Sequence, residues 1–540
     1  MGQRAQHPLI AGTRITSLGT LLGRVLGMLR DMATASMFGL AAGGVMDAFV
    51  IAFRIPNLFR RLFGEGALTA SYLPVLTTQL ESDRHRARQL ASVVIALLAV
   101  LLTGLVAVGE LLFGLVWLFW GDVPGVGLLI GLSAVMLPYL LLICIAAQLT
   151  TMLYASQHFT VPALTPAVLN VVWLVAAGIA AWCFTGNQVA QAYVLAAGVV
   201  VAGAAQVAVQ LPMLRRLGFH FDYNWSAARE GLRQIGRNLA PMLVGLAVTQ
   251  INTFNDSLVA WGLARAADGP QYIPWLGSAV RYPMEQGAAA AIYYGERLYE
   301  FPLGIVGTAM AVAIFPLLSR HAARGDRRQL GADMTLGLRL VFCLGVPASV
   351  GLILLAEPIA RLLFERGHFG PDDTLRAARM IACYATGVWA YCASPVIVRG
   401  FYALNDCGTP VRVAAWMVAL NLALNFTLIW PLAEAGLAVS TAVSAAVQMF
   451  VLMFLFSRRQ ASLGWRHLAA TAARTCLATL LMAVTVRFAA SLTPTAGGLL
   501  HEFLQVGVPI ALGGAVYGIA YWLLGGRELG MLLGRSRSGP

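Results

Sequence analysis

The sequence predicts an all-α polytopic membrane protein, and three observations support this fold class. Hydrophobic residues make up 59% of the 540-residue chain and charged residues 11%, whereas soluble domains carry about 25% charged residues. Apolar segments of the length that spans a bilayer, about 20 residues, recur along the whole chain. Two short stretches also occur twice in the same order, which predicts two related halves.

About fourteen segments meet the length criterion for a transmembrane helix. They lie near residues 12–38, 45–79, 90–120, 127–155, 162–184, 189–214, 237–263, 284–318, 332–356, 376–403, 411–431, 435–457, 468–491 and 503–525. The loops that follow even-numbered segments hold most of the loop arginines, among them Arg215, Arg216 and Arg229. Because cytoplasmic loops carry an excess of arginine, both termini are predicted to be cytoplasmic.

The repeated stretches divide the chain into lobes. MLYASQHFTVP (152–162) resembles GFYALNDCGTP (400–410), and YLPVLTTQ (72–79) resembles IFPLLSRH (314–321). Six spans separate each pair, so the halves share an orientation and are expected to be related by a pseudo-two-fold axis along the membrane normal. The predicted domains are an N-lobe (1–214), a cytoplasmic linker (215–236), a C-lobe (237–457), and two further helices with the C-terminus (458–540).

Charged residues inside the apolar segments are the candidate functional residues. A charge at mid-membrane costs roughly 2.5–3.5 kcal/mol, so such residues normally face a polar cavity or a partner. We expect Arg24, Arg30, Arg60 and Arg297 to converge on one cavity, where guanidinium groups suit a pyrophosphate. The alternative is that they are interfacial anchors or ion-pair partners. The supporting charges are Asp31, Asp47, Arg54, Arg61, Glu65, Glu296 and Glu300. Glu300 lies three positions after Arg297, so the two are expected to pair on one helical face.

Other residues at membrane depth suggest motion and ion coupling. Gly19, Gly23 and Gly27 form a ridge on the first segment, and Pro56 is expected to kink the second; each is either a hinge or a packing feature. Asp256, Asn421 and Asn425 supply oxygens that suit a monovalent cation, or else form interhelical hydrogen bonds. Asn421 and Asn425 are four positions apart and are therefore expected on one helical face. No other cofactor and no metal site is expected, and coupling to an ion or to the membrane potential stays open.

Three stretches carry a resemblance to a known family. GRVLGMLRDMATASMFG (23–39), MDAFVIAFRIPNLFRRLFGEGALTASYLPVL (46–76) and YYGERLYEFPLGI (293–305) resemble the MurJ (MviN) family of bacterial lipid II flippases, in the MOP exporter superfamily. The resemblance implies an inner-membrane protein of fourteen helices that moves undecaprenyl-pyrophosphate-linked disaccharide pentapeptide to the periplasmic face by alternating access. The family's cavity arginines fall on Arg24, Arg30, Arg60 and Arg297.

The resemblance also implies that residues 468–525 form a groove for the lipid tail, and it suggests membrane lipids and cell-wall synthesis proteins as partners. The segment 264–287 looks longer than is usual in the family, so its role is left open.

The same residues bear on three competing functions. A MOP exporter of another polyprenyl-pyrophosphate-linked glycan shares the expected chemistry, whereas a cation-coupled drug antiporter favours an anionic cavity. An enzyme acting on polyprenyl pyrophosphate needs clustered carboxylates for a metal, or a nucleophile beside a base, and neither pattern is found in the charged segments. Nucleic acid is not an expected partner despite the net charge of +13, because no basic domain with interleaved aromatics occurs.

Overall fold

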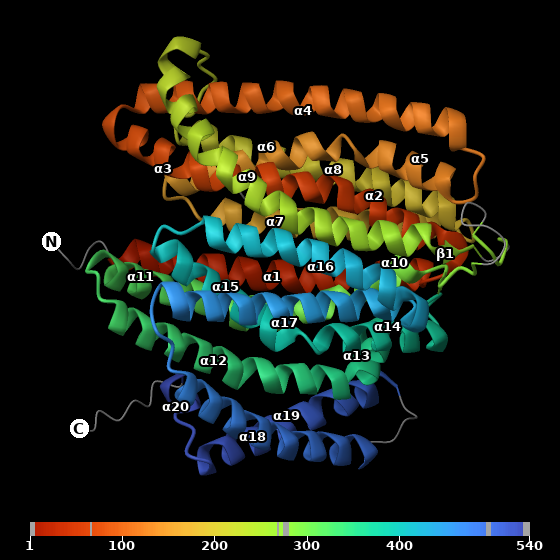
Figure 1. Cartoon of the computed structure of the whole chain (residues 1–540). Helices are drawn as coiled ribbons and strands as arrows, with labels where there is room; N and C mark the ends of the chain where they lie inside the picture. Colours follow the sequence, from red (N-terminus) through yellow and green to blue (C-terminus); the bar gives the residue numbers. More distant parts are fainter. Residues whose placement is uncertain (1–5, 65–66, 267–268, 274–279, 493–497, 533–540) are drawn as a thin grey trace. The chain divides into compact units, whose positions relative to one another are not determined.

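A computed structural model describes residues 6–64, 67–266, 269–273, 280–492 and 498–532. These residues are almost entirely helical (Figure 1). The chain divides into two compact units, Met1–Ala289 with Arg366–Phe369, and Ala290–Glu365 with Gly370–Pro540.

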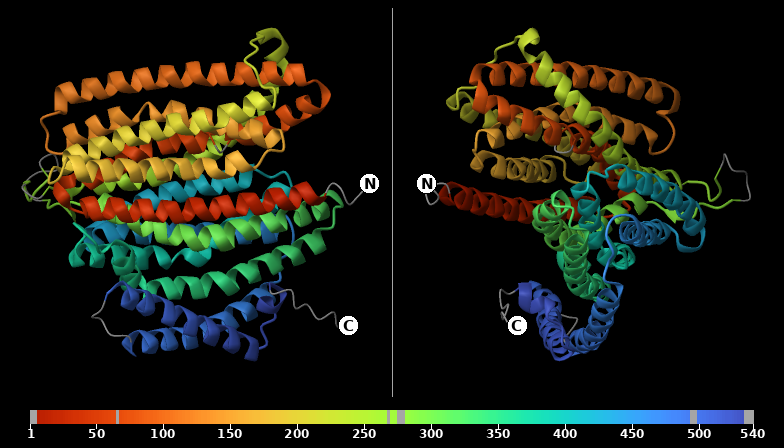
Figure 2. Two further views of the ribbon diagram at one scale, coloured as in Figure 1. Left: turned by 180° about the vertical axis from the view of Figure 1, so that it is seen from behind. Right: turned by 60° about the vertical axis from the view of Figure 1, so that its left-hand side comes forward.

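The first unit is a bundle of long helices with one short strand pair (Figures 1 and 2). Its elements are α1 (Gln6–Phe38), η1 (Ala42–Gly44), α2 (Val45–Phe59), η2 (Arg60–Gly64), α3 (Ala67–Ser82), α4 (Arg84–Trp120), α5 (Val126–Met136), α6 (Tyr139–Ala155), α7 (Thr160–Cys183), α8 (Gln188–Arg216), α9 (Trp225–Gly262), β1 (Ala264–Arg265) and β2 (Met284–Glu285). The two strands pair in parallel.

The second unit is also a helical bundle, and α18 and α19 form a hairpin beside α12 (Figure 1). Its elements are α10 (Ala288–Pro302, beginning at the end of the first unit), η3 (Leu303–Thr308), α11 (Ala309–Ala323), α12 (Arg327–Leu354), α13 (Ala356–Phe364), α14 (Pro371–Ala385), α15 (Val388–Ala403), α16 (Gly408–Leu432), α17 (Glu434–Arg459), α18 (Trp465–Leu492), α19 (Leu499–Leu523) and α20 (Glu528–Leu532).

Most of the predicted spans are confirmed as helices that can cross a membrane. Among the described residues, ten helices or unbroken helix runs are long and apolar enough, and α14 with α15, bent by 42°, forms an eleventh if counted as one span. The described residues of predicted segments 12–38, 45–79 and 237–263 are mostly helical, but these segments do not belong to this set, and the first two carry the clustered arginines. The multi-span all-α fold is therefore confirmed, whereas the number fourteen stays a prediction.

The internal repeat is visible in local geometry. Asp83 caps the start of α4 by accepting from the backbone N–H of His85 (2.9 Å), and Asp326 caps α12 by accepting from that of Gln329 (3.0 Å). Gln157 and Asn405, which are equivalent in the repeated stretches, both adopt a positive φ of 58°. Residues other than glycine rarely occupy this region, so the shared conformation supports two copies of one structural motif.

The boundary between the predicted lobes differs from the observed helices. Residues 217–224 connect α8 to α9, so the connection is shorter than the predicted segment 215–236. The compact units meet in the chain at Ala289 and Ala290. The predicted lobes were defined by the repeat and not by compactness, and that division stays a prediction.

Candidate functional site

A π-helical turn interrupts the second predicted span. Pro56 lies inside α2, and the five residues of η2 follow that helix directly. A π-turn leaves backbone carbonyls without their usual α-helical partners, and side chains satisfy them here. Gln148 on α6 donates from Nε2 to the carbonyls of Phe63 (3.0 Å) and Gly64 (3.1 Å). The backbone irregularity that follows Pro56 is therefore held by side-chain hydrogen bonds, and a kink at Pro56 itself stays a prediction.

The η2 turn presents two of the predicted arginines. Arg60 is its first residue and is half-buried, whereas Arg61 is exposed and donates to Oε1 of Gln250 on α9 (3.4 Å). Arg54, one helical turn before η2, donates from Nη1 to the carbonyl of Thr253 (3.1 Å). Helices α2 and α9 together position these side chains. Glu65, predicted as a supporting charge, lies outside the described residues.

Arg30 has a different environment. It is buried on α1 and forms an ion pair with Asp31, Nη2 to Oδ1, at 2.7 Å. Its Nη1 donates to Asn170 on α7 (3.2 Å), and its guanidinium lies 4.8 Å from the ring centroid of Trp173. Asp31 is the immediate neighbour of Arg30 in sequence, which an argument from helical spacing misses. The contacts show that Arg30 joins α1 to α7.

Arg24 and Asp47 differ sharply in exposure. Arg24 is exposed on α1, and Asp47 is buried near the start of α2. Oδ2 of Asp47 accepts the backbone N–H of Gly287 at 2.7 Å. The carboxylate therefore bonds the end of segment 264–287, whose role the sequence left open, to the start of α2.

In the second unit, α10 carries the remaining charges. Arg297 pairs with Glu300 (3.2 Å), as the spacing of three predicted. Its Nη2 donates to the hydroxyl of Tyr293 (2.9 Å), and its guanidinium lies 4.7 Å from the centroid of that ring. Arg297, Glu300 and Glu296 are all half-buried. Whether Arg297 shares a cavity with the arginines of the first unit stays a prediction.

The structural repeat identifies an arginine that sequence reasoning placed second. Gly64 at the end of η2 and Gly307 in η3 each lie beside a cysteine of a neighbouring helix, Cys144 on α6 and Cys392 on α15 respectively. The spacing between these glycines, applied to Arg54, leads to Arg297. Arg54 is therefore the repeat counterpart of Arg297. The repeated stretches lie 242 and 248 positions apart, close to the 243 positions that separate these two glycines.

Two of the three residues proposed for ion coupling, Asn421 and Asn425, belong to a hydrogen-bonded cluster in the second unit. Asn425 donates to Oδ1 of Asn421 (3.1 Å), and Asn421 donates to Oγ1 of Thr441 (3.3 Å). Ser440 donates to Oδ1 of Asn425. Both asparagines are buried on α16, so their predicted common face is confirmed. Asp256 is buried on α9 in the first unit.

The glycine ridge of α1 packs against α7. A Cβ at Gly19 would come within 2.6 Å of the Cβ of Ala163. Asn170 donates to the carbonyl of Gly23 (3.0 Å) and lies 3.6 Å from the position of a Cβ at Gly27. The ridge thus permits close helix contact, and its role as a hinge stays a prediction.

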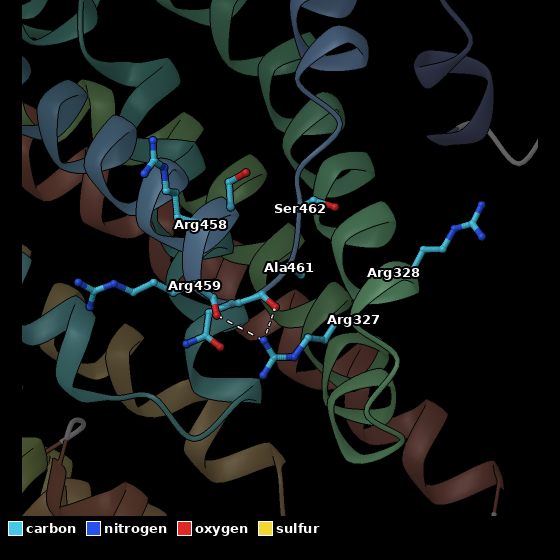
Figure 3. Close-up of a pocket in the computed structure, with 8 residues that line it drawn as sticks. Arg327, Arg328, Arg458, Arg459, Ala461 and Ser462 are labelled. Carbon is cyan, nitrogen blue, oxygen red and sulfur yellow. Dashed lines mark hydrogen bonds between the residues drawn. The ribbon is translucent and has the colours of Figure 1, made fainter.

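The second unit also has a shallow surface pocket of about 300 Å³. Its eight lining residues include four arginines, at the start of α12 and the end of α17. Arg327 donates to the carbonyls of Arg459 (3.4 Å) and Gln460 (3.2 Å), while the side chains of Arg328, Arg458 and Arg459 point away from one another (Figure 3). Because its guanidinium groups diverge, the pocket is not a convergent anion site.

Taken together, the described residues are suited to binding and moving a solute. They contain no cluster of three or more His, Cys, Asp or Glu side chains able to hold a metal. Guanidinium groups within apolar helices bind oxyanions strongly, and repeated helical halves are typical of secondary transporters. The fold and site define the class of polytopic membrane transporter.

Comparison with known proteins identifies the family. The family model described as lipid II flippase MurJ matches residues 34–507. A probable lipid II flippase MurJ of Vibrio cholerae is 34% identical over 79% of this chain and 78% of its own length, and one of Rhizobium tropici is 31% identical over 97% of each chain. The chain belongs to the MurJ family.

Solved structures support the fold. A lipid II flippase MurJ in an inward closed conformation aligns with a TM-score of 0.73, covering 94% of this chain and 99% of its own, at 21% identity. A multidrug resistance MATE family transporter of the MOP superfamily in an inward-facing conformation gives 0.64, covering 82% and 95%, at 13% identity. At these identities the likeness shows a shared architecture.

Proposed function

We propose that this protein is a flippase that moves lipid II from the cytoplasmic to the periplasmic leaflet of a bacterial inner membrane by alternating access. The observation that carries the proposal is the set of arginines on otherwise apolar helices: Arg24 and Arg30 on α1, Arg54 and Arg60 on α2 and η2, and Arg297 on α10. Membership of the MurJ family supplies the substrate class.

The arginines have a direct use in this mechanism. A pyrophosphate carries several oxygens, and guanidinium groups bind such oxygens bidentately and keep their charge in a low-dielectric site. The sugar and peptide need only a polar path, and the lipid tail stays in the apolar phase. No covalent step is required. In this proposal both termini are cytoplasmic, in agreement with the arginine-rich loops.

The arginines are not equivalent as test positions. Removing one member of a buried ion pair costs about 3–5 kcal/mol, so Arg30→Ala is expected to fail through the instability that follows loss of the buried pair with Asp31. Arg24 and Arg60 are exposed and half-buried, respectively, and provide cleaner tests. Arg412 on α16 is exposed and bonds to the carbonyl of Gly408, within its own helix, so Arg412→Ala is a suitable control.

The test is complementation of a bacterium depleted of its own lipid II flippase, with growth and externally accessible lipid II as readouts. The wild type and Arg412→Ala are expected to rescue, while Arg24→Ala and Arg60→Ala, present at equal membrane levels, are expected to fail. Normal growth supported by both cavity variants would contradict the proposed role of the arginines. Failure of a well-inserted wild type would favour export of a different polyprenyl-pyrophosphate-linked glycan.

Coupling to a monovalent cation is a second part of the proposal. The side-chain oxygens of buried Asn421, Asn425 and Ser440 and of half-buried Thr441 lie together between α16 and α17, and such oxygens suit a hard cation. A bound ion would replace part of this hydrogen-bond network. Replacing sodium with choline in a reconstituted flipping assay should slow the wild type. Rates that stay equal in the two salts would remove ion coupling from the proposal.

A further inference from the structure

A buried carboxylate joins four helices of the second unit. Glu528, the first residue of α20, has no exposed surface. Its Oε1 accepts from Nη2 (2.5 Å) and Nε (2.9 Å) of Arg339 on α12, and from Oγ1 of Thr471 on α18 (3.0 Å). Its Oε2 accepts from the hydroxyl of Tyr521 on α19 (2.7 Å) and from the backbone N–H of Arg527 (2.9 Å). We call this arrangement the Glu528 clasp.

The clasp is ionised at neutral pH. Burial alone would raise the pKa of Glu528, but the hydrogen bonds from Tyr521, the backbone and Thr471, with the charge of Arg339, outweigh it and lower the pKa to about 2. A carboxyl whose pKa is lowered by folding stabilises the folded state at pH values above its pKa in the unfolded chain. This contribution is lost as the pH falls through the pKa of the folded state. The clasp is therefore intact over the physiological range.

The location of the clasp gives it a mechanical role. Helices α18 and α19 form a hairpin whose outer face is strongly apolar, with Phe488 64% and Trp522 71% exposed. In lipid, apolar contact does not by itself drive helices together, so close packing of small residues and interhelical polar bonds decide which helices stay in contact. The hairpin therefore depends on specific ties to α12.

The interface beside the clasp supports this dependence. Thr471, Thr475 and Thr479 recur every fourth residue on α18 and are buried, as expected for a seam of small residues in close contact. Tyr517 on α19 donates to the carbonyl of Cys343 on α12 (2.5 Å). The clasp and this bond thus tie both hairpin helices to α12.

We infer that Glu528 is a positioning residue that fixes the α18–α19 hairpin to α12, so that these helices move as one body while the substrate crosses. This inference rests on the proposed lipid II transport. It assigns a function to a residue that does not contact Arg297, the candidate cavity arginine of α10. It also means that the α12–hairpin interface does not open during the cycle.

The first experiment measures the hairpin without any substrate. Spin labels at exposed Ile353 on α12 and Phe488 on α18, with the exposed native cysteines Cys183, Cys407 and Cys476 replaced by serine, report the distance between the ends of the two helices in liposomes. Glu528→Ala should broaden the distance distribution. Glu357→Ala breaks an exposed Arg–Glu pair of 2.7 Å on α13 and is the matched control, expected to leave the distribution narrow. An unchanged distribution in Glu528→Ala would overturn the inference.

The second experiment asks whether the tie itself is what transport needs. In Glu528→Ala, which removes one partner of a buried ion pair, flipping should fall at least about tenfold. A Cβ at Gly464 would lie 3.2 Å from Cγ2 of Thr335, so Thr335→Cys with Gly464→Cys can form a disulfide between α12 and the start of α18. Oxidation should restore flipping by Glu528→Ala, and a reductant added to the same vesicles should remove it again.

The same disulfide in the protein with Glu528 intact provides the opposing test. If α12 and the hairpin move as one body, the oxidised protein flips at a rate close to that of the reduced protein. Reversible arrest on oxidation would show that the interface must open, and would overturn the inference. Absence of flipping in the unmodified protein would instead count against the proposed function, and the spin-label comparison would still decide the role of Glu528.

Discussion

The two π-helical turns occupy equivalent places in the repeat but are held in different ways. In the first unit, Gln148 donates to two carbonyls of η2, and Thr69 also donates to the carbonyl of Gly64 (2.5 Å). The repeat counterpart of Gln148 is Val396, an apolar residue that is fully buried on α15. Val396 has no side-chain donor, so it cannot form with η3 the hydrogen bonds that Gln148 forms with η2.

Close packing takes the place of this tie in the second unit. A Cβ at Gly307 would come within 2.8 Å of the Cα of Cys392, whereas a Cβ at Gly64 would stay 3.9 Å from the Cα of Cys144. The comparison teaches that one irregular backbone can be kept by two physical means. A hydrogen bond fixes the relative direction of its two groups and persists when the helices separate slightly. Van der Waals contact between backbones stabilises the turn only while the two helices are in contact.

The two turns should differ most in the stability and activity lost when Gly307 or Gly64 is replaced by alanine. Gly307→Ala places its Cβ against backbone atoms of α15 that cannot move aside, and overpacking of this kind costs about 1–3 kcal/mol. Gly64→Ala meets the Cβ of Ala147 at 3.2 Å and Cγ of Arg60 at 3.3 Å, and the arginine side chain can shift. Complementation and thermal unfolding should both show the greater loss in Gly307→Ala. Equal losses would remove the proposed difference between the turns.

A smaller loss is expected when the hydrogen-bond tie is removed. Gln148→Met keeps the volume but leaves the carbonyl of Phe63 without this donor, at a cost of about 1–3 kcal/mol. Gln191→Met is the matched control, because Gln191 is buried and donates to one carbonyl, that of Phe184 (3.1 Å). The midpoint temperature of thermal unfolding should fall in both variants. The flipping rate, measured below that temperature, should fall only in Gln148→Met. A slowed Gln191→Met would assign the effect to stability alone.

The smallest effects are expected at the shared cysteines. Sγ of Cys144 lies 3.8 Å from the carbonyl of Phe59, and that of Cys392 lies 3.7 Å from the carbonyl of Pro302. A thiol is a weak donor, so Cys144→Ala and Cys392→Ala should each change flipping by less than about twofold. A large loss in either, with insertion unchanged, would show that this contact is an essential part of its π-turn.

The sequence carried enough information for the class and the repeat, because both depend on composition and spacing. Length and hydropathy predicted the spans, and the Tyr154–Tyr402 correspondence predicted a repeat that now extends to shared positive φ angles. The pairing of Arg297 with Glu300 followed from helical spacing and is confirmed.

Other features depend on contacts that no local pattern encodes. Arg30 pairs with its neighbour Asp31 and reaches Asn170, 140 positions away, and the tertiary packing of α1 on α7 sets this geometry. The π-helical turns have no distinctive composition beyond the adjacent prolines Pro56 and Pro302. The sequence gives no signal for Glu528, because a single acidic residue after the last apolar segment is typical of a solvent-exposed chain terminus. Its burial is visible only in the fold.

The clasp also has a consequence for the order of biosynthesis. Arg339 and Glu528 are 189 positions apart, so α12 leaves the ribosome long before its carboxylate partner exists. During that interval the guanidinium has to remain at the membrane surface or in contact with other groups. Pairing becomes available only after both hairpin helices have been made. A chain whose synthesis stops before Glu528 therefore keeps the charge of Arg339 without this carboxylate. The presence or absence of the Arg339–Glu528 pair distinguishes finished from unfinished molecules.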